Sequence, residues 1–108
     1  SGGWRFTDSW SSRLESRGQH TNHVHPHGWI SAVYYVEVPA VCADAVAQQG
    51  WLRFGEPDLE MAASFPALTS VEPRPGRLVL FPSYWWHGTT PFESPQPRLT
   101  IAFDVLPL

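Results

Sequence analysis

The chain has a single cysteine, Cys42, no lysine and no long apolar run. One cysteine cannot form an internal disulfide, which favours a reducing compartment such as the cytoplasm. No segment approaches the ~18 consecutive apolar residues that span a bilayer, and no signal-peptide pattern opens the chain. All seven positive residues are arginines and the net charge is −3, so no basic stripe is available for nucleic acid. We therefore expect a cytoplasmic protein whose partners are neither nucleic acids nor membranes.

The composition is sufficient for one folded domain. The chain has 108 residues, of which 43% are hydrophobic, and it includes six Trp and six Phe. This length and aromatic content predict a single domain over residues 1–108. The first residue is Ser1 rather than Met, and an apolar aromatic follows at Trp4, which is compatible with the C-terminal part of a longer protein.

Eleven prolines and eight glycines interrupt the chain and predict a mainly β fold with little helix. Short strands at this spacing are typical of a sandwich or barrel. A short helix fits residues 40–48, and residues 8–15 fit either a strand or a short helix. The turn at Pro82 and Ser83 is expected to bring the strand after it back against the strand before it. The predicted strands are residues 29–38, 49–54, 77–81, 85–90 and 98–106.

The last of these strands alternates between two kinds of side chain, which places them on opposite faces. The apolar face would need cover from a missing N-terminal segment or from a second copy of the chain. On the other face, the guanidinium of Arg98 and the hydroxyl of Thr100 can bind one carboxylate together. The alternative is an exposed arginine at a strand entrance. The apolar set is Leu99, Ile101, Phe103 and Val105, and the opposite set is Arg98, Thr100, Ala102 and Asp104.

Four of the five histidines gather in one segment, as His20, His23, His25 and His27. In a strand, side chains two residues apart project from the same face with Cα atoms ~6.5–7 Å apart, so two imidazoles can bind one metal ion. His23 and His25 have this spacing. His25 and His27 have it too, but Pro26 and Gly28 are residues that end strands. We therefore favour His23 and His25 as metal ligands, with His27 as the alternative to either.

The fifth histidine, His87, is the third candidate ligand and comes from a distant part of the chain. Three protein ligands on one side of a metal, with other positions open, form the facial arrangement of non-haem iron oxygenases. The competing interpretation is a chance pair or surface cluster of histidines. The spacing of His87 ahead of the strand that carries Arg98 favours the metal site.

Taken in order, these motifs resemble the 2-oxoglutarate/Fe(II)-dependent oxygenases, and most of all their small prolyl-hydroxylase-like branch. The resemblance covers about residues 8–106. The eleven-residue step from His87 to Arg98 is similar to that between the distal iron histidine and the basic co-substrate residue of the superfamily. The matching elements are His23-x-His25, residues 31–36, residues 76–83, His87 and residues 98–104.

The resemblance implies a double-stranded β-helix, which is a jelly-roll or cupin-like barrel, with Fe(II) as cofactor and 2-oxoglutarate as co-substrate. His23, His25 and His87 would be the metal ligands, with no catalytic residue beyond the metal centre. Arg98, supported by Thr100 and by Tyr35 or its neighbour Tyr34, would bind the far carboxylate of 2-oxoglutarate. His25 stands where the superfamily usually has Asp or Glu, which leaves the metal one negative charge short and favours Zn or Ni somewhat more.

This dioxygenase would couple oxidative decarboxylation of 2-oxoglutarate to oxidation of a small-molecule or peptide substrate. Trp29, Trp85 and Trp86 could form aromatic walls around the pocket. Three alternatives stay open at this point: a cupin-like metal-binding module, a three-His thiol dioxygenase that uses no 2-oxoglutarate, and an inactive structural β domain. A serine hydrolase is poorly supported because the chain has no Gly-x-Ser-x-Gly motif.

Overall fold

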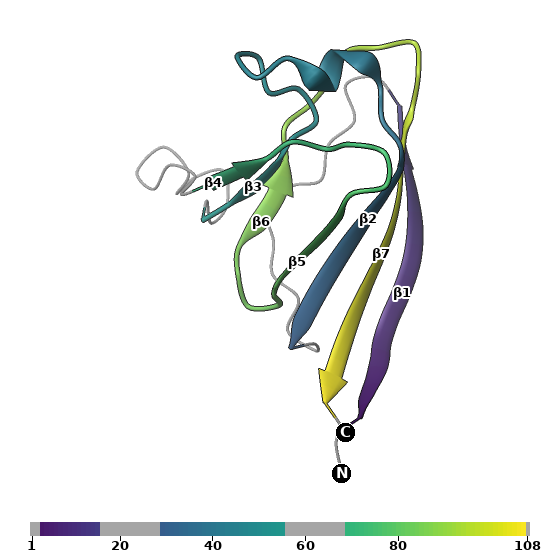
Figure 1. Ribbon diagram of the computed structural model, residues 1–108, viewed down its shortest axis with the longest axis vertical. Coiled ribbons are helices and arrows are strands. Elements are labelled where there is room, and N and C mark those ends of the chain that lie inside the picture. The colour runs from purple at the N-terminus through teal and green to yellow at the C-terminus, as the bar shows by residue number, and fades with distance from the viewer. Residues whose placement is uncertain (1–2, 16–28, 56–68, 108) are drawn as a thin grey trace.

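A computed structural model describes residues 3–15, 29–55 and 69–107. Two antiparallel sheets face each other, a four-stranded sheet in the order β1-β7-β2-β5 and a three-stranded sheet in the order β4-β3-β6 (Figure 1). This confirms the mainly β fold class, with the two facing sheets of a jelly roll. The strands are β1 (Trp4–Leu14), β2 (Ile30–Glu37), β3 (Leu52–Phe54), β4 (Thr69–Val71), β5 (Leu78–Pro82), β6 (His87–Thr89) and β7 (Arg98–Pro107).

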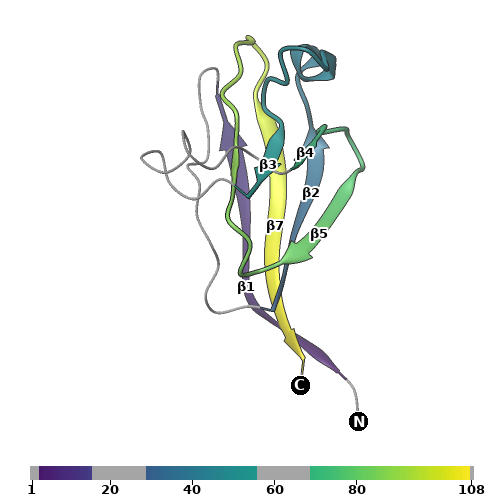
Figure 2. The same ribbon diagram turned by 90° about the vertical axis from the view of Figure 1, so that its left-hand side faces the viewer.

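Strand β2 lies inside the four-stranded sheet, between β7 and β5 (Figure 2). Its β-branched and aromatic residues fit a pleated, half-buried surface, and Pro39 follows where the ladder has ended. The prediction of a central strand over residues 29–38 is therefore confirmed. Strand β7 agrees in the same way with the strand predicted over residues 98–106. Of the undecided residues 8–15, all but the last belong to a strand, β1 (Trp4–Leu14).

The predicted partner of β6 is wrong. Residues 85–90 were expected to pair with residues 77–81, but β6 pairs with β3 in the other sheet. After β5, the amide of Ser83 donates to the carbonyl of Trp29, and a turn closes where the amide of Trp85 donates to the carbonyl of Pro82. This turn carries the chain across from one sheet to the other. A turn motif shows that the chain changes direction, whereas the strand it then pairs with depends on which apolar faces can be buried together.

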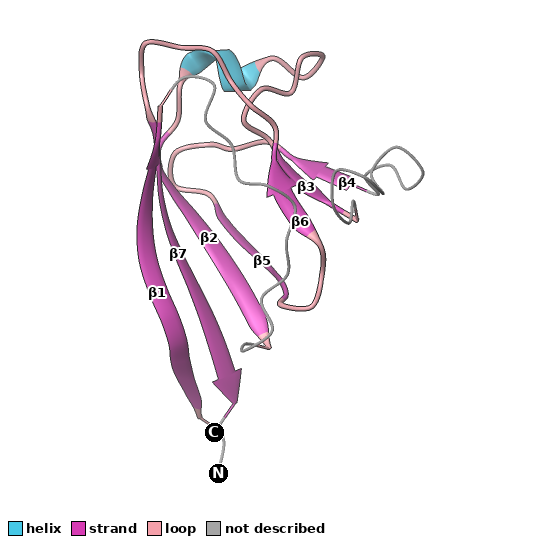
Figure 3. Cartoon of the chain, turned by 180° about the vertical axis from the view of Figure 1, so that it is seen from behind, coloured by secondary structure: helices cyan, strands magenta, loops and turns pink. Residues whose placement is uncertain are grey.

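Helical structure is nearly absent from the described residues. The helix expected within residues 40–48 is a single short 3-10 helix, η1 (Ala40–Ala43), shown in cyan in Figure 3. No helix in the described part of the chain has the length and apolar character needed to cross a membrane.

The core lies between the two sheets. Leu52 and Phe54 from β3 pack with Phe81 from β5, and the half-buried Val33, Val71 and Val79 surround them. The outer face of the four-stranded sheet is different, because several of its large apolar side chains are exposed. These are Tyr34, Leu78, Leu80 and Ile101.

Candidate active site

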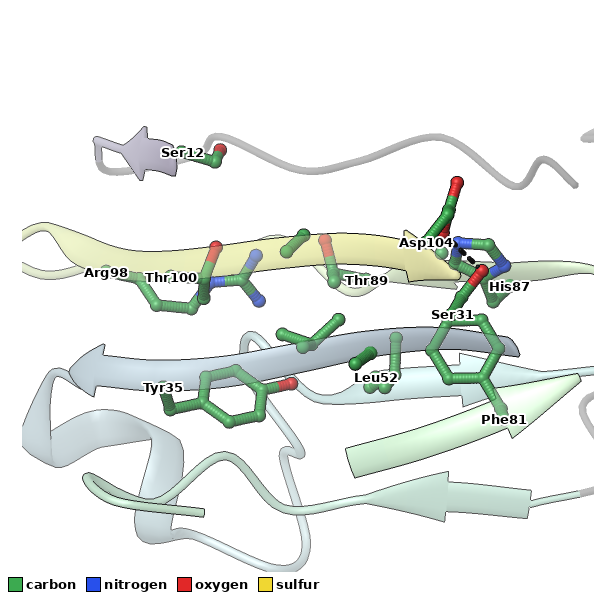
Figure 4. Close-up of a pocket in the computed structure, with 14 residues that line it drawn as sticks. Ser12, Ser31, Tyr35, Leu52, Phe81, His87, Thr89, Arg98, Thr100 and Asp104 are labelled. Carbon is green, nitrogen blue, oxygen red and sulfur yellow. Dashed lines mark hydrogen bonds between the residues drawn. The ribbon is translucent and has the colours of Figure 1, made fainter. Parts of the chain in front are cut away.

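A pocket opens between the two sheets and is lined from both of them. The four-stranded sheet contributes most of the polar side chains, and the three-stranded sheet contributes Leu52 from β3 and residues 87–89 from β6. Arg98, Thr100 and Tyr35 lie toward one end of the pocket, and His87, Ser31 and Asp104 lie toward the other (Figure 4). The alternation predicted for β7 is confirmed, since Arg98, Thr100, Ala102 and Asp104 all line this pocket.

Arg98 is a buried cation at one end of the pocket. Its side chain is only 2% exposed, and its Nη1 donates a hydrogen bond to the carbonyl oxygen of Gly50 at 2.9 Å. Its Nε has no hydrogen-bond partner, and no carboxylate within the described ranges forms an ion pair with it. Burial lowers the pKa of Arg98, while Tyr35 and Cys42 act in the opposite direction. Because a buried charge is costly unless it is paired, this end of the pocket is suited to an anion.

Tyr35 lies beside the guanidinium, whose carbon is 5.8 Å from the centre of the tyrosine ring. Burial raises the pKa of Tyr35 to about 12, and the charge of Arg98 opposes this. The phenol is therefore neutral at physiological pH and can donate a hydrogen bond, yet its hydroxyl oxygen has no partner among the described residues. Thr100 is directly opposite Tyr35 in the β2–β7 ladder. Tyr34 is 39% exposed on the other face, so Tyr35 is the tyrosine that reaches the pocket.

Gly50 is a residue that the sequence analysis missed. Its carbonyl fixes Arg98, and its own amide donates to the carbonyl of Thr90 at 3.1 Å. The backbone has φ +71°, and a Cβ atom there would lie 2.9 Å from the Sγ atom of Cys42. No local motif indicates this role, because Gly50 and Arg98 are 48 residues apart in sequence.

His87 is held in a fixed orientation at the other end of the pocket. It is 6% exposed, and its ring centroid is 4.6 Å from that of Phe81. Its Nδ1 lies 3.1 Å from the carbonyl oxygen of Trp85. A carbonyl can only accept, so Nδ1 carries the proton and Nε2 carries the lone pair that a metal needs. Metal-binding histidines commonly have this kind of hydrogen bond to a backbone carbonyl, so the ring fits the predicted role.

The other two predicted metal ligands, His23 and His25, lie outside the described residues, as do His20 and His27. Within residues 3–15, 29–55 and 69–107, no three His, Cys, Asp or Glu side chains are grouped closely enough to hold a metal. Of the six predicted site residues, the structure therefore brings four together in one pocket. These are His87, Arg98, Thr100 and Tyr35.

The sequence placed Asp104 on the pocket face of β7 but assigned no role to its carboxylate, which lies at the His87 end of the pocket (Figure 4). The Ser31 hydroxyl donates to Asp104 Oδ1 at 2.6 Å, and the Ser31 and Ser83 hydroxyl oxygens are 2.9 Å apart. Asp104 is 3% exposed and lines the pocket. Strand parity placed Asp104 on the face of Arg98, and the same rule could have found Ser31, which shares the face of Tyr35. No sequence signal indicates Ser83.

The prediction that three tryptophans form the walls of the pocket is wrong. Trp29 is 63% exposed, Trp85 and Trp86 are 42% and 39% exposed, and none of them lines the pocket. These tryptophans precede β2 and β6 instead of lying inside the strands, so strand alternation does not direct them inward. The largest apolar side chains that line the pocket are those of Leu52 and Phe81.

Two facing sheets, with a buried arginine at one end of their pocket and an oriented histidine at the other, define a jelly-roll protein whose pocket is suited to an anion. Residues 8–104 match the model of the family described as "Putative 2OG-Fe(II) oxygenase", and the chain belongs to this family. The description of the family names 2-oxoglutarate and Fe(II), which are the co-substrate and the metal expected from the sequence.

Solved structures share the fold of this chain. A prolyl-4-hydroxylase from Pseudomonas putida aligns with a TM-score of 0.60 and 19% identity, over 89% of this chain and 50% of that one. HygX from Streptomyces hygroscopicus with iron bound aligns with a TM-score of 0.63 and 17% identity, over 94% of this chain and 58% of that one. HygX with nickel and 2-oxoglutarate bound aligns with a TM-score of 0.64 and 17% identity, over 94% of this chain and 57% of that one. The chain thus spans little more than half the length of these structures. No curated protein matches it.

Proposed function

We propose that this chain is a 2-oxoglutarate/Fe(II)-dependent dioxygenase that hydroxylates a small-molecule or peptide substrate. The observation that carries the proposal is the buried guanidinium of Arg98, which has no carboxylate partner in the described part of the chain. A fold that buries such a charge without a counter-ion gains most from an anionic ligand that supplies one.

The far carboxylate of 2-oxoglutarate is the proposed counter-ion. Arg98 would donate from its Nε, and the neutral phenol of Tyr35 would donate from its hydroxyl, since both atoms lack partners among the described residues. Thr100 lies opposite Tyr35 and adds a hydroxyl to the same end of the pocket. Hydrogen bonds to charged groups contribute about 1.5–3 kcal/mol each, so two of them would account for specific recognition of a carboxylate.

The metal would be held by His23, His25 and His87, with the Nε2 lone pair of His87 aimed by the contact of Nδ1 with Trp85. When bound, iron supplies the redox chemistry that activates dioxygen and decarboxylates the keto acid. The chain's own residues orient the co-substrate between the two ends of the pocket, and the apolar side chains of Leu52 and Phe81 keep water from the space between them.

The same observation argues against the two metal-binding alternatives. A cupin-like metal-binding module and a thiol dioxygenase need the histidines but have no use for a buried arginine and a buried tyrosine that line the same pocket. Recognition of 2-oxoglutarate is therefore the property to test.

The decisive experiment is an anaerobic titration of the Fe(II)-loaded protein with 2-oxoglutarate, followed by visible absorption. Chelation of the metal by the keto acid is expected to give a weak charge-transfer band. In Arg98→Ala, the band should require at least tenfold more 2-oxoglutarate, because each lost charged hydrogen bond contributes about 1.5–3 kcal/mol. Arg74→Ala is the matched control, since Arg74 has an exposed side chain that pairs with Glu72. Absence of the band, or an unchanged titration for Arg98→Ala, would refute the proposal.

A further inference from the structure

Three residues form a row across the four-stranded sheet at the metal end of the pocket. Phe81 on β5 is opposite Ser31 on β2, and Ser31 is opposite Asp104 on β7. His87 packs on the ring of Phe81 from the other sheet. Neighbouring strands are about 4.7–4.9 Å apart, so Asp104 is two strand spacings from the phenylalanine against which His87 rests. Asp104 and His87 line the same pocket, and Figure 4 shows both at one end of it.

A directed chain of hydrogen bonds positions the Asp104 carboxylate. The Ser31 hydroxyl has one hydrogen, which it donates to Asp104 Oδ1 at 2.6 Å. Ser83 must then be the donor in the 2.9 Å contact between the two serine hydroxyls. Ser31 and Ser83 are themselves 2% and 0% exposed. The carboxylate is thus fixed by groups that have almost no contact with solvent.

A fixed carboxylate at this place matches a deficit in the predicted ligand set. The predicted ligands His23, His25 and His87 are all imidazoles, which bind a metal in their neutral form, so a divalent ion bound by them would keep its full charge. We propose that Asp104 is a positioning residue of the metal centre, which supplies from β7 the negative charge that His25 does not. This inference rests on the proposed function, because it requires a metal at His87.

The consequence is electrostatic. A carboxylate close to a bound cation stabilises it strongly inside a pocket, where screening by water and salt is weak. Residues that support a metal site from outside its ligand set typically change metal affinity by about 10–100-fold when they are replaced. Asp104→Asn isolates this effect, because asparagine has the same shape and its Oδ1 can still accept the hydrogen bond from Ser31.

The test is calorimetric binding of Mn(II), a redox-inert divalent ion, and of Fe(II) under anaerobic conditions, each without 2-oxoglutarate. Asp104→Asn should weaken both by about 10–100-fold while the thermal stability of the metal-free protein stays close to that of the wild type. Ser31→Ala keeps the charge of Asp104 but removes the hydrogen bond that positions it, so it should weaken metal binding by a smaller factor. Glu37→Gln removes the same charge from an exposed position at the end of β2 and should change neither affinity.

Equal metal affinity of Asp104→Asn and the wild type would overturn the inference, while Arg98-dependent binding of 2-oxoglutarate would leave the proposed function intact. Equal losses in Asp104→Asn and Glu37→Gln would also overturn it, because only net charge would then matter. Failure of the wild type to bind any divalent ion would overturn both proposals. If Asp104→Asn does not fold, Ser31→Ala decides the question, and an unchanged affinity in that variant counts against the role of Asp104.

Discussion

The Arg98 guanidinium donates a hydrogen bond from Nη1 to the backbone carbonyl oxygen of Gly50 at 2.9 Å. This bond joins the first residue of β7 to the loop before β3, and it orients a cation that lines the pocket. Gly50 can place its carbonyl there because its backbone has φ +71°, a conformation that residues with a side chain rarely adopt. The anion end of the pocket therefore depends on a glycine that does not line it.

Replacing Gly50 by alanine should destabilise the protein and weaken the co-substrate site. The positive φ and the new contact with Cys42 Sγ, at 2.9 Å from the added Cβ, both oppose alanine. We expect the free energy of unfolding to fall by about 1–3 kcal/mol, as measured by urea denaturation. Binding of 2-oxoglutarate should weaken as well, because the carbonyl that fixes Arg98 moves with the backbone.

Gly76→Ala is a matched control for this variant. Gly76 has φ +84°, but a Cβ atom there would meet nothing within 4 Å. Gly76→Ala should therefore lower the free energy of unfolding only through backbone strain. Any larger decrease in Gly50→Ala then measures the effect of the contact with Cys42. The double variant Gly50→Ala/Cys42→Ala should recover that excess. Equal losses for Gly50→Ala and Gly76→Ala would show that the Cys42 contact has no effect.

Tyr35→Phe should change stability and binding in opposite directions. The buried hydroxyl of Tyr35 has no partner among the described residues, and a buried unsatisfied polar group costs about 1–3 kcal/mol. Removing it should leave the free energy of unfolding of the ligand-free protein unchanged or higher. Removing it should also weaken 2-oxoglutarate binding by about 10- to 150-fold, since a hydrogen bond to a charged group contributes about 1.5–3 kcal/mol.

Tyr34→Phe is the control, because Tyr34 is half-exposed on the opposite face of β2. It should alter neither the unfolding free energy nor the binding of 2-oxoglutarate. A large loss of stability in ligand-free Tyr35→Phe would mean that the hydroxyl serves the fold, and the proposed contact with the co-substrate would be wrong.

Periodicity was sufficient to predict one whole face of the pocket. The alternation along β7 correctly placed Arg98 and Thr100 together, because a strand has a side-chain period of two and only one face of it is buried. The same rule implied that only one of the neighbours Tyr34 and Tyr35 can face the pocket, and the burial of Tyr35 shows that it is this one. Local pattern thus predicts which residues share a face wherever a strand is long.

Contacts between distant segments could not be predicted. The pairing of β6 with β3, the bond from Arg98 to Gly50 and the chain from Ser83 through Ser31 to Asp104 all join residues far apart in sequence. Each depends on how the two sheets pack, which no local spacing encodes. The prediction for the three tryptophans was wrong for a related reason. An aromatic residue outside a strand does not alternate between two faces, so its direction cannot be predicted from its position.

The raised pKa of Tyr35 makes stability fall at high pH. Burial raises this pKa from 10.0 to about 12 in the folded protein, so the unfolded chain loses the phenol proton first as pH rises. The stabilisation is therefore complete below pH 10 and is lost as pH rises through 12. At pH 11 the loss should be about 1.4 kcal/mol.

The measurement is urea denaturation of the wild type and of Tyr35→Phe at pH 9 and pH 11. The wild type should lose about 1.4 kcal/mol more than the variant between the two pH values, since every other titrating group is common to both. Parallel losses would show that Tyr35 ionises as easily in the folded protein as in the unfolded chain.

The separation of His87 and Arg98 along the pocket predicts that metal and co-substrate binding can be lost independently. His87→Ala should abolish the rise in unfolding temperature that Mn(II) causes, because the ligand whose orientation Trp85 and Phe81 fix is removed. Arg98→Ala should keep that rise and lose only the further rise on adding 2-oxoglutarate. Ligands stabilise by mass action, about 2.7 kcal/mol at a concentration of 100 Kd, so thermal unfolding with each ligand added in turn measures both effects. A loss of the Mn(II) effect in Arg98→Ala would show that the two ends form one indivisible site, and the assignment of separate roles to them would be wrong.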